Sequence, residues 1–489
     1  MSTSTAAPGS TLRSLIPARM DRLPWTRFHW TVVVGLGVSW ILDGLEIQMV
    51  SANGFAKQLG MDATEVGITG TVYLLGQVFG ALVFGRLSDR LGRRKFFIIT
   101  LAIYLVASGI AGLSFAPWFL WIFRFIAGMG IGGEYTAINS AIDEIIPSKY
   151  RGRVDIAING TYWGGAALGA AANLYLLGDP GLVESGWGWR IGFFLGPVLG
   201  LVIIFLRRNI PESPRWQLTH GQEQVAEDNV ARIEAEVERE SGKPLEKVPD
   251  EKAIDVPVHD RVPFAIVWHT FVHTYPKRAI VAFTMMITQS FLYNAIFFTY
   301  ALVLQNFYDI DNAAIYFFPF AIGNLIGPLV LGHLFDTIGR RQMIFATYGL
   351  ASVVLAVSAA LFAADLLTAL TQTVLWSISF FFASAGASAA YLTVSETFPL
   401  QLRGQAISYC FAVGQFVGAF APTIYGALVG DGSDRGPLAA GYYLGAGVML
   451  VGGVVALVLG VSAERKSLEE LSDVDFLEKA QAQIDAKRR

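Results

Sequence analysis

The sequence predicts an all-α membrane protein with twelve spanning helices arranged as two six-helix repeats. Three observations predict this fold: the composition, a series of apolar runs, and two loop motifs that each occur twice. Hydrophobic residues make up 53% of the 489-residue chain and charged residues only 15%, whereas soluble domains carry about 25% charged residues. This deficit of charge indicates that most of the chain lies in lipid.

Twelve apolar runs are each long enough to cross about 30 Å of hydrocarbon at 1.5 Å per residue. The first six predicted spans cover 29–50, 65–87, 94–114, 117–139, 155–178 and 188–206. The second six cover 278–305, 312–334, 341–364, 368–391, 405–428 and 438–461. The predicted parts of the chain are therefore an N-terminal segment 1–28, a bundle 29–206, a linker 207–277, a second bundle 278–461 and a tail 462–489. Within the linker, residues 222–240 are dense in Glu and Arg and predict a solvated helix.

Basic residues in the short loops predict the orientation. If the N-terminus is cytoplasmic, eleven Arg and Lys residues fall in inner short loops and two, Lys57 and Arg435, in outer loops. Such a bias is the positive-inside pattern of membrane proteins. We therefore expect a multi-pass protein of the plasma (cell inner) membrane with both termini and the linker in the cytoplasm. No cleavable signal region precedes the first span, which then acts as the signal itself.

Two loop motifs recur in the same order in the two halves. The segment Gly85-Arg-Leu-Ser-Asp-Arg-Leu-Gly-Arg-Arg94 returns as Gly332-His-Leu-Phe-Asp-Thr-Ile-Gly-Arg-Arg341 at an offset of 247, and the Glu, Pro and Arg that follow the fourth span return at an offset of 252. Parallel repeats of this kind place a substrate site between the halves. The arginines could simply hold the loops inside, but the fixed Gly and Asp favour ion pairs that close the cytoplasmic side. The predicted gating residues are Gly85, Asp89, Arg93, Glu144, Arg151, Asp336, Arg340, Glu396 and Arg403.

Several of these segments carry a family resemblance. Gly85–Arg94, Pro211-Glu-Ser-Pro-Arg215 and Glu396-Thr-Phe-Pro-Leu-Gln-Leu-Arg-Gly404 resemble the signature segments of the sugar porter family of the major facilitator superfamily. Two shorter segments, Gly132-Gly-Glu-Tyr135 and Asp43-Gly-Leu-Glu46, are similar instead to metabolite/proton and aromatic-acid/proton symporters. The resemblance implies secondary transport by alternating access, with a small-molecule substrate and protons as partners.

Three ionisable residues inside spans are candidates for proton coupling, because charges at membrane depth are costly and usually functional. Asp43 and Arg124 each lie roughly 10 Å below the outer face, so we expect them to form an ion pair. Separating the pair would favour protonation of Asp43, as the resemblance also implies; a static pair that only locks the bundle is the alternative. Glu134, roughly 25 Å from the outer end, is either a second coupling carboxylate or a partner of the cytoplasmic arginines. Glu46, one turn from Asp43, is near enough to the outer end to be solvated.

A second group of polar and aromatic residues predicts a substrate cavity. Thr288-Gln-Ser-Phe-Leu-Tyr-Asn294 resembles the sugar-binding segment of the family, although its first Gln is missing. Amides both donate and accept hydrogen bonds, and rings supply an apolar wall; interhelical hydrogen bonding is the alternative role for each residue. The fifth span has Ala166 where related porters place a sugar-binding Gln, so organic acids and other metabolites stay open as substrates. The predicted substrate-binding residues are Asn159, Trp163, Gln289, Tyr293, Asn294, Asn324, Tyr391 and Gln415.

The cysteine content, the phosphate-binding motifs and the net charge decide among the remaining classes of function. The one cysteine, Cys410, and the want of a glycine-rich phosphate loop with Lys predict no metal site and no cofactor. A net charge of −3 without a dense basic face predicts no nucleic-acid partner. We expect a monomeric, lipid-embedded, proton-coupled symporter of a small polar metabolite such as a sugar, and not an enzyme. The alternatives are an uncoupled facilitator, a drug exporter, a transporter of organic or aromatic acids, and a membrane nutrient sensor.

Overall fold

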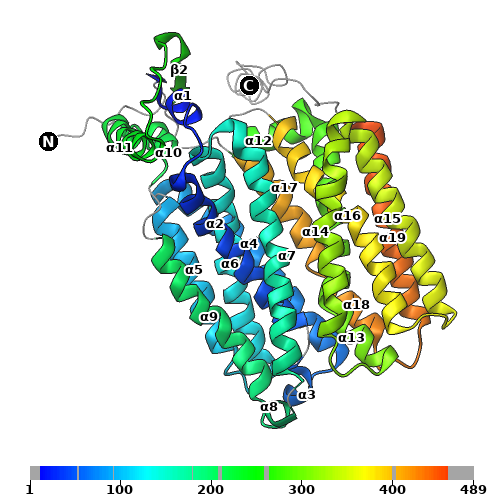
Figure 1. Cartoon of the computed structure of the whole chain (residues 1–489). Helices are drawn as coiled ribbons and strands as arrows, with labels where there is room; N and C mark the ends of the chain where they lie inside the picture. The colour runs from blue at the N-terminus through cyan, green and yellow to red at the C-terminus, as the bar shows by residue number, and fades with distance from the viewer. Residues whose placement is uncertain are drawn as a thin grey trace.

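The computed structural model describes residues 11–51, 54–91, 93–178, 180–207, 212–257, 264–398 and 403–460. Each predicted span coincides with a long helix or a helix pair (Figure 1). The first six are α2 (Arg27–Ser51), α4 (Ala63–Leu91), α5 (Arg93–Ala111), α6 (Pro117–Ile145), α7 (Ser148–Leu176) and α9 (Trp187–Arg207). The second six are α13 (Pro276–Tyr308), α14 (Ala314–Thr337), α15 (Arg340–Ala363), α16 (Ala369–Thr397), the pair α17 (Arg403–Gly418) and α18 (Ala421–Val429), and α19 (Gly436–Leu459). In the described residues, eight of these segments are long and apolar enough by composition to cross a membrane.

Proline residues shape the ends of several helices. Pro117 opens α6 and Pro276 opens α13, positions where the missing N–H costs nothing. Pro422 has the opposite effect inside the predicted span 405–428, because it has no N–H to donate into the preceding turn. The structure therefore corrects that span to two helices, with a break between Gly418 and Ala421.

The two halves pair their helices in the same order. In the N-terminal half the contacts join α2 to α7, α4 to α6, and α5 to α9. The corresponding contacts of the C-terminal half join α13 to α17, α14 to α16, and α15 to α19. The internal repeat predicted from the loop motifs is therefore present in the packing of the helices.

Glycines at close helix crossings give the register of the repeat. A Cβ on Gly80 of α4 would overlap the backbone of Met129 on α6, and a Cβ on Gly327 of α14 would overlap the backbone of Phe381 on α16. These two crossings are related by offsets of 247 and 252, the same offsets as the loop motifs. Close crossings of small residues are the usual way for membrane helices to approach one another. Corresponding positions in α4 and α14, and in α6 and α16, can therefore be assigned.

A second pair of crossings aligns the first helix of each half. Gly169 of α7 packs against the backbone of Leu45 on α2, and Gly418 of α17 packs against the backbone of Ser290 on α13. Leu45 and Ser290 are thus corresponding positions, at an offset of 245.

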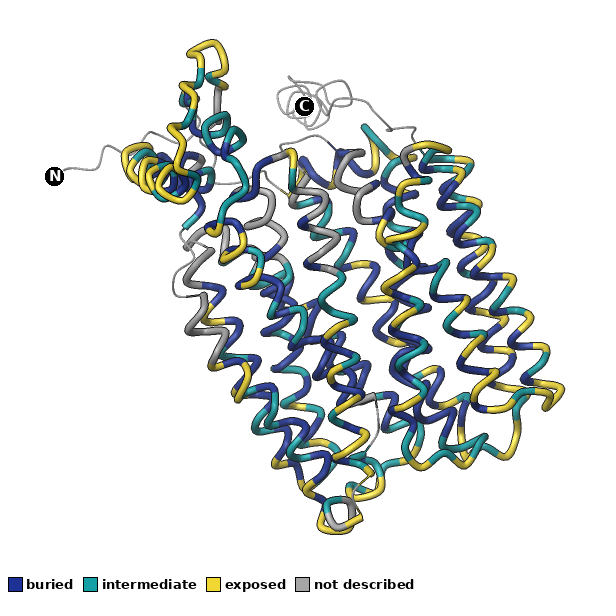
Figure 2. The backbone as a smooth tube through the Cα atoms, in the orientation of Figure 1, coloured by how far each residue is buried: buried dark blue, intermediate teal, exposed yellow. Residues whose placement is uncertain are grey.

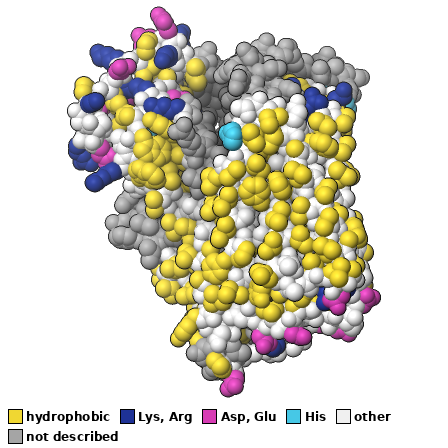
Figure 3. Space-filling view, turned by 45° about the vertical axis from the view of Figure 1, so that its right-hand side comes forward, with side chains coloured by type: hydrophobic (Ala, Val, Ile, Leu, Met, Phe, Trp, Pro, Cys, Tyr) yellow, Lys and Arg dark blue, Asp and Glu magenta, His cyan; other side chains and the backbone are white. Residues whose placement is uncertain are grey.

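Apolar side chains cover the outer faces of the bundle. The exposed stretches lie on the outward sides of the helices and the buried ones face the bundle interior (Figure 2). In the space-filling view, hydrophobic side chains cover the face shown, and Asp and Glu gather at its lower rim (Figure 3). Val353 of α15, Leu370 of α16 and Val458 of α19 are each more than half exposed, at 59%, 59% and 66%. A surface of this kind suits lipid tails as the surrounding solvent.

A small module of short elements sits at one end of the bundle, which we name the linker end (Figure 1). It contains β1 (Thr11–Ser14), α1 (Ile16–Asp21), α10 (Pro214–Thr219), α11 (Glu223–Ser241), a 3₁₀ turn (Asp250–Lys252) and β2 (Ile254–Pro257). At the same end, α12 (Phe264–His269) and a π-helical turn (Thr270–Thr274) pack on α13 and α17 of the C-terminal half. The short helices α3 (Ala56–Leu59) and α8 (Pro180–Glu184) lie at the other end, the opposite end. Strands β1 and β2 pair antiparallel, with Thr11 opposite Pro257. The sequence did not predict this two-stranded sheet.

The linker helix α11 is docked on the bundle and is not solvated all round. Ala226, Val230, Ile233 and Val237 form its buried face, which belongs to one apolar cluster with α1 and the N-terminal half. On the same helix, Glu234 accepts hydrogen bonds from Arg19 at 2.6 Å and Arg22 at 2.5 Å. Burial opposes ionisation of Glu234, but the two arginines outweigh it and lower the pKa of that carboxyl. The predicted solvated helix is thus an amphipathic one that straps residues 11–25 to the N-terminal half.

Candidate functional site

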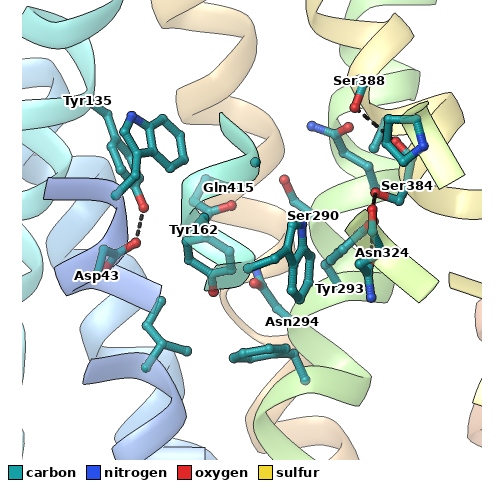
Figure 4. A pocket seen from close by; sticks show the side chains of 18 of the residues that line it. Asp43, Tyr135, Tyr162, Ser290, Tyr293, Asn294, Asn324, Ser384, Ser388 and Gln415 are labelled. Atoms are coloured by element: carbon teal, nitrogen blue, oxygen red, sulfur yellow. Dashed lines mark hydrogen bonds between the residues drawn. The ribbon is translucent and has the colours of Figure 1, made fainter. Parts of the chain in front are cut away.

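A cavity of about 270 Å³ lies between the two halves, near the middle of the bundle. The N-terminal half lines it from α2, α4, α6 and α7, and the C-terminal half from α13, α14, α16 and α17. Figure 4 shows Asp43, Tyr135 and Tyr162 on one side and Tyr293, Asn324 and Ser384 on the other. A pocket of this size suits a small molecule of one ring.

Six of the eight predicted substrate-binding residues line this cavity: Trp163, Gln289, Tyr293, Asn294, Asn324 and Gln415. The side chains of the other two, Asn159 and Tyr391, lie outside the described residues. The structure therefore brings together residues of four helices that the sequence could only place at similar depth. Their role in binding stays a prediction.

Asn324 is the best-anchored polar residue of the C-terminal wall. Its Oδ1 accepts a hydrogen bond from the Tyr293 hydroxyl at 2.9 Å, and its Nδ2 donates to the Phe320 carbonyl at 2.9 Å. The backbone carbonyl of Asn324 accepts from Ser384 at 2.8 Å. These bonds connect α13, α14 and α16, so the orientation of Tyr293 and Asn324 is fixed before any ligand arrives.

Aromatic rings form much of the rest of the wall. Trp40 stacks on Tyr135, with ring centroids 4.4 Å apart and an interplanar angle of 20°. Trp163 lies 6.1 Å from Tyr293 and 6.0 Å from Phe297 across the two halves. Further residues line the cavity that were not predicted from the sequence to do so: Trp40, Asp43, Gln77, Phe297, Phe411, Ser384 and Ser388. The helical spacing of Ser384 and Ser388 was the signal that could have found those two.

One hydrogen bond joins the halves at the level of the cavity. The amide of Gln415 on α17 donates to Oε1 of Gln77 on α4 at 3.0 Å, and both residues line the cavity. A ligand that pairs with either amide would compete with this bond.

The deep cation pairs with a carboxylate other than the predicted one. Arg124 forms its ion pair with Glu46, not with Asp43, so the predicted Asp43–Arg124 pair is wrong in its acidic partner. Glu46 also accepts a hydrogen bond from Ser108 at 2.7 Å and is 2% exposed. The expectation that Glu46 is solvated is therefore also wrong, because Ser108 of α5, Arg124 of α6 and Gly196 of α9 surround its carboxylate.

Tyr73 explains why Arg124 and Asp43 do not meet. The Arg124 guanidinium lies over the Tyr73 ring, 3.8 Å from its centroid, while the Tyr73 hydroxyl donates to Asp43 at 2.6 Å. Tyr135 donates to the other oxygen of Asp43. The tyrosine therefore separates the two charges and touches both.

The other predicted charges are placed as follows. Glu134 is buried in α6, and the described lining takes its neighbour Tyr135 from that helix. Arg340 begins α15 at the linker end and is 7% exposed. The side chains of Asp89, Arg93, Glu144, Arg151, Asp336, Glu396 and Arg403, together with Gly85, lie outside the described residues. The proton-coupling role of Glu134 and the gating role of the other residues stay predictions.

Contacts between the halves cluster on one side of the cavity. Gln48 on α2 donates to the Tyr300 hydroxyl on α13, and Asn312, between α13 and α14, donates to the Asn173 carbonyl on α7. Within the N-terminal half, Asn173 donates to the Gln48 carbonyl and so connects these two bonds. Among described residues, these bonds and the Thr71–Thr423 bond of 2.8 Å lie between the cavity and the opposite end. We name them the opposite-end latch.

Comparison with known proteins identifies the family. A family model described as "Sugar (and other) transporter" matches residues 44–474. The niacin transporter NiaP of Acinetobacter baylyi is 26% identical over 93% of this chain and 99% of its own length. The inner membrane metabolite transport protein YdjE of Escherichia coli is 26% identical over 94% of this chain and 99% of its own length.

A solved structure shares the fold. The inward-open xylose transporter XylE of E. coli has a TM-score of 0.68 and 19% sequence identity, and the match covers 91% of this chain and 98% of that one. The chain therefore belongs to the sugar (and other) transporter family: it is a membrane transporter with the major facilitator fold and not an enzyme.

Proposed function

We propose that the protein is a proton-coupled symporter that carries a small metabolite across the plasma membrane by alternating access. The observation that carries the proposal is the position of Asp43: its carboxyl lines the cavity between the halves and lies one helical turn from the Glu46–Arg124 ion pair. A carboxyl at membrane depth beside a substrate cavity can bind a proton, and its protonation changes the charge that the ligand meets.

Tyr73 supplies the route from protonation to a change of shape. Arg124 has two buried guanidinium nitrogens, Nε and Nη2, without a hydrogen-bond partner among the described residues. An ionised Asp43 attracts this partly satisfied cation, and the Tyr73 ring stands between them. Protonating Asp43 removes the attraction and leaves Arg124 to Glu46. The position of Tyr73 between α2 and α6 then depends on the proton.

The latch supports alternating access. The positive-inside bias places the linker end in the cytoplasm, so the opposite-end latch faces outward. Hydrogen bonds that join the halves on the outer side of the cavity describe a conformation that is closed to the outside. Outward opening requires these bonds to break as one half rocks against the other.

Two substrate classes remain in competition. Sugars are favoured by the family resemblance and by the amides of Gln289, Asn294 and Asn324. A small aromatic acid is favoured by the rings of Trp40, Tyr135 and Trp163 and by the niacin transport of a relative. In both cases the proton gradient drives uptake.

The test is uptake into proteoliposomes under an imposed pH gradient, with D-xylose, D-glucose, nicotinate, nicotinamide and benzoate as substrates. Asp43→Asn should abolish accumulation against a substrate gradient while exchange of substrate continues. Thr288→Val is the matched control, because Thr288 occupies the position in α13 that corresponds to Asp43 by the helix register. If Asp43→Asn still accumulates substrate, the coupling mechanism is wrong.

A further inference from the structure

A row of exposed apolar side chains lies on α12 and on the π-helical turn that follows it. Phe264 is 55% exposed, Trp268 57% and Val272 44%, and their spacing of four residues puts them on one side of the helix. The rings of Phe264 and Trp268 stack on each other, with centroids 6.4 Å apart and an interplanar angle of 27°. We name these three residues the α12 row. Large apolar side chains that gather at a surface mark an interaction site.

The other side of α12 already has its partner. Ile266, Val267 and Phe271 are buried in one apolar cluster with residues of α13 and α17. The ring of Phe271 lies 5.4 Å from that of Phe283 on α13. The helix is therefore apolar on two sides, one packed on the C-terminal half and the other exposed, and the packed side fixes the direction of the α12 row.

The chain places α12 where α13 begins, at the linker end of the bundle (Figure 1). Pro276 is the first residue of α13, and because proline has no N–H the helix does not run on from α12 into α13. By the register of the helix crossings, Tyr275 corresponds to Trp30 of α2, an exposed residue in the first turn of its span. Tyr and Trp at the ends of spanning helices mark the interface between membrane and water.

The α12 row joins the outer surface of the bundle and not the cavity. The Phe264 ring lies 5.4 Å from that of Tyr409 on α17. Tyr409 is on the same side of α17 as Val413 and Phe416, which are exposed on the outer face of the bundle. Phe411, two residues after Tyr409, points to the opposite side of α17 and lines the cavity. The α12 row is therefore continuous with the surface that lipid covers.

Basic side chains stand beside the α12 row, in the first turn of α13. Lys277 is exposed, and the Arg278 guanidinium lies over the Tyr275 ring, 4.3 Å from its centroid. The positive-inside bias places this end of the bundle at the cytoplasmic side, where anionic headgroups attract Lys and Arg. Aromatic and basic residues next to an apolar row fit a lipid surface.

We infer that α12 is an in-plane membrane anchor, whose exposed row inserts into the cytoplasmic leaflet at the boundary between headgroups and acyl chains. The partner is the lipid surface itself, with Lys277 at the level of the anionic headgroups. Helices of this kind bury their apolar side about 5–10 Å into that boundary. Because α12 leads into α13, which carries Gln289 and Asn294 in the cavity wall, the anchor sets the depth of that helix in the bilayer.

Spin labels on three exposed valines test the anchor in the full chain. Val272→Cys is compared with Val225→Cys on α11 as the aqueous reference and Val353→Cys on α15 as the membrane reference. The native Cys410 is buried, so the unsubstituted protein should take up no label. Each labelled variant is placed in nanodiscs of phosphatidylcholine and phosphatidylglycerol, and its collision rates with oxygen and with a water-soluble nickel chelate are measured.

The ratio of the two collision rates gives the depth of each label. The label at Val272 should report a depth of about 5–10 Å at the headgroup boundary, between those of the two references. A nickel collision rate at Val272 equal to that at Val225 would place the row in water and overturn the inference. A label at Val272 that neither reagent reaches would mean that a protein segment covers the row, which also overturns it.

A second substitution tests whether the indole holds the helix in the lipid. Added to Val272→Cys, Trp268→Ser should raise the nickel collision rate at the label at least about twofold, because interfacial binding scales with buried apolar area. Trp118→Ser removes an exposed tryptophan at the opposite end and should leave the rate unchanged. An unchanged rate in Trp268→Ser contradicts the anchor. All these substitutions alter exposed side chains, so each variant should keep the unfolding temperature of the unsubstituted protein.

Discussion

The two halves have the same backbone packing and different chemistry at corresponding positions. By the register of the glycine crossings, Arg124 of α6 corresponds to Trp376 of α16, and Asp43 of α2 corresponds to Thr288 of α13. The first pair contrasts a fully buried cation with an indole that is 2% exposed and lies 6.3 Å from Tyr442. The two halves thus share their helix contacts, whereas the ion pair buried at membrane depth, Glu46–Arg124, belongs to the N-terminal half.

Buried volume is used differently in the two halves. In the N-terminal half the space around Arg124 holds Glu46, Tyr73 and Ser108, a polar cluster that can change its hydrogen bonds. In the C-terminal half the equivalent space holds the Trp376 ring, which packs and cannot titrate. From this contrast we propose that the N-terminal half handles the proton and the C-terminal half holds most of the substrate.

The largest expected effect comes from breaking the buried ion pair. Arg124→Leu leaves Glu46 buried without its cation, and removing one partner of such a pair costs about 3–5 kcal/mol. We expect a marked fall in the thermal unfolding temperature of the protein in detergent.

The double variant Glu46→Gln with Arg124→Leu should recover most of that stability while transport stays uncoupled. A double variant as unstable as Arg124→Leu alone would show that the arginine acts mainly through packing on Tyr73. Arg124 and Trp376 would then both serve as packing side chains, and the contrast between the halves would not concern charge.

The next effect separates affinity from coupling. Asn324→Ala removes the acceptor of Tyr293 and should raise the KM for substrate about tenfold, the equivalent of about 1.4 kcal/mol. The accumulation ratio under a fixed pH gradient should not change, because Asn324 belongs to the C-terminal half. Asn306→Ala, which alters an asparagine that donates to the Gly430 carbonyl near the opposite end, is the control. A changed accumulation ratio in Asn324→Ala would contradict the assignment of proton coupling to the N-terminal half and of substrate binding to the C-terminal half.

A smaller effect is expected at the latch. Tyr300→Phe removes the hydroxyl that accepts from Gln48 across the halves, a bond worth about 1 kcal/mol. Hydrogen exchange of the α18 amides should accelerate about fivefold, since opening becomes more frequent. Tyr308→Phe breaks a bond to Gln372 inside the C-terminal half and should leave that exchange unchanged. Equal acceleration in both variants would mean that the latch does not hold the halves together.

The smallest effect concerns the strap of residues 11–25. Because Arg19 and Arg22 lower the pKa of Glu234, their stabilisation is present above its usual value of 4.5 and is lost as the pH falls through the lowered value. Hydrogen exchange in α1, corrected for the intrinsic rate, should therefore increase between pH 5 and pH 3, and Glu234→Gln should show the increase already at neutral pH. Glu236→Gln on the same helix is the control and should behave as the unmodified protein. A pH-independent rate would assign the strap to its apolar contacts alone.

Much of the fold could be predicted because its signals are local or repeated. Apolar runs place each span, and two loop motifs give offsets that the helix crossings reproduce. Part of the cavity wall could also be predicted, since Gln289, Asn294 and Asn324 are polar residues at similar depth in an apolar context. The β1–β2 pair could not be predicted, because its strands are separated by more than two hundred residues and neither has a strong strand pattern.

The contacts within the charge cluster could not be predicted by counting residues along a helix. Counting along a helix gives the depth of Asp43, Glu46 and Arg124, but it does not give the direction in which each side chain points across the bundle. Tyr73, on a different helix, decides that direction by occupying the space between Arg124 and Asp43. A sequence with a tyrosine at that depth carries no local sign of such a role.

The helix α2 carries both Asp43 and Gln48, about 7.5 Å apart along its axis. One end of this short interval touches the cavity and the other holds the opposite-end latch. Thermodynamic reciprocity then applies to a single rigid element: by whatever factor protonation of Asp43 alters closure of the latch, closure alters the proton affinity of Asp43. An antibody fragment that clamps the outer loops would therefore act as an effector of proton binding without touching the carboxyl.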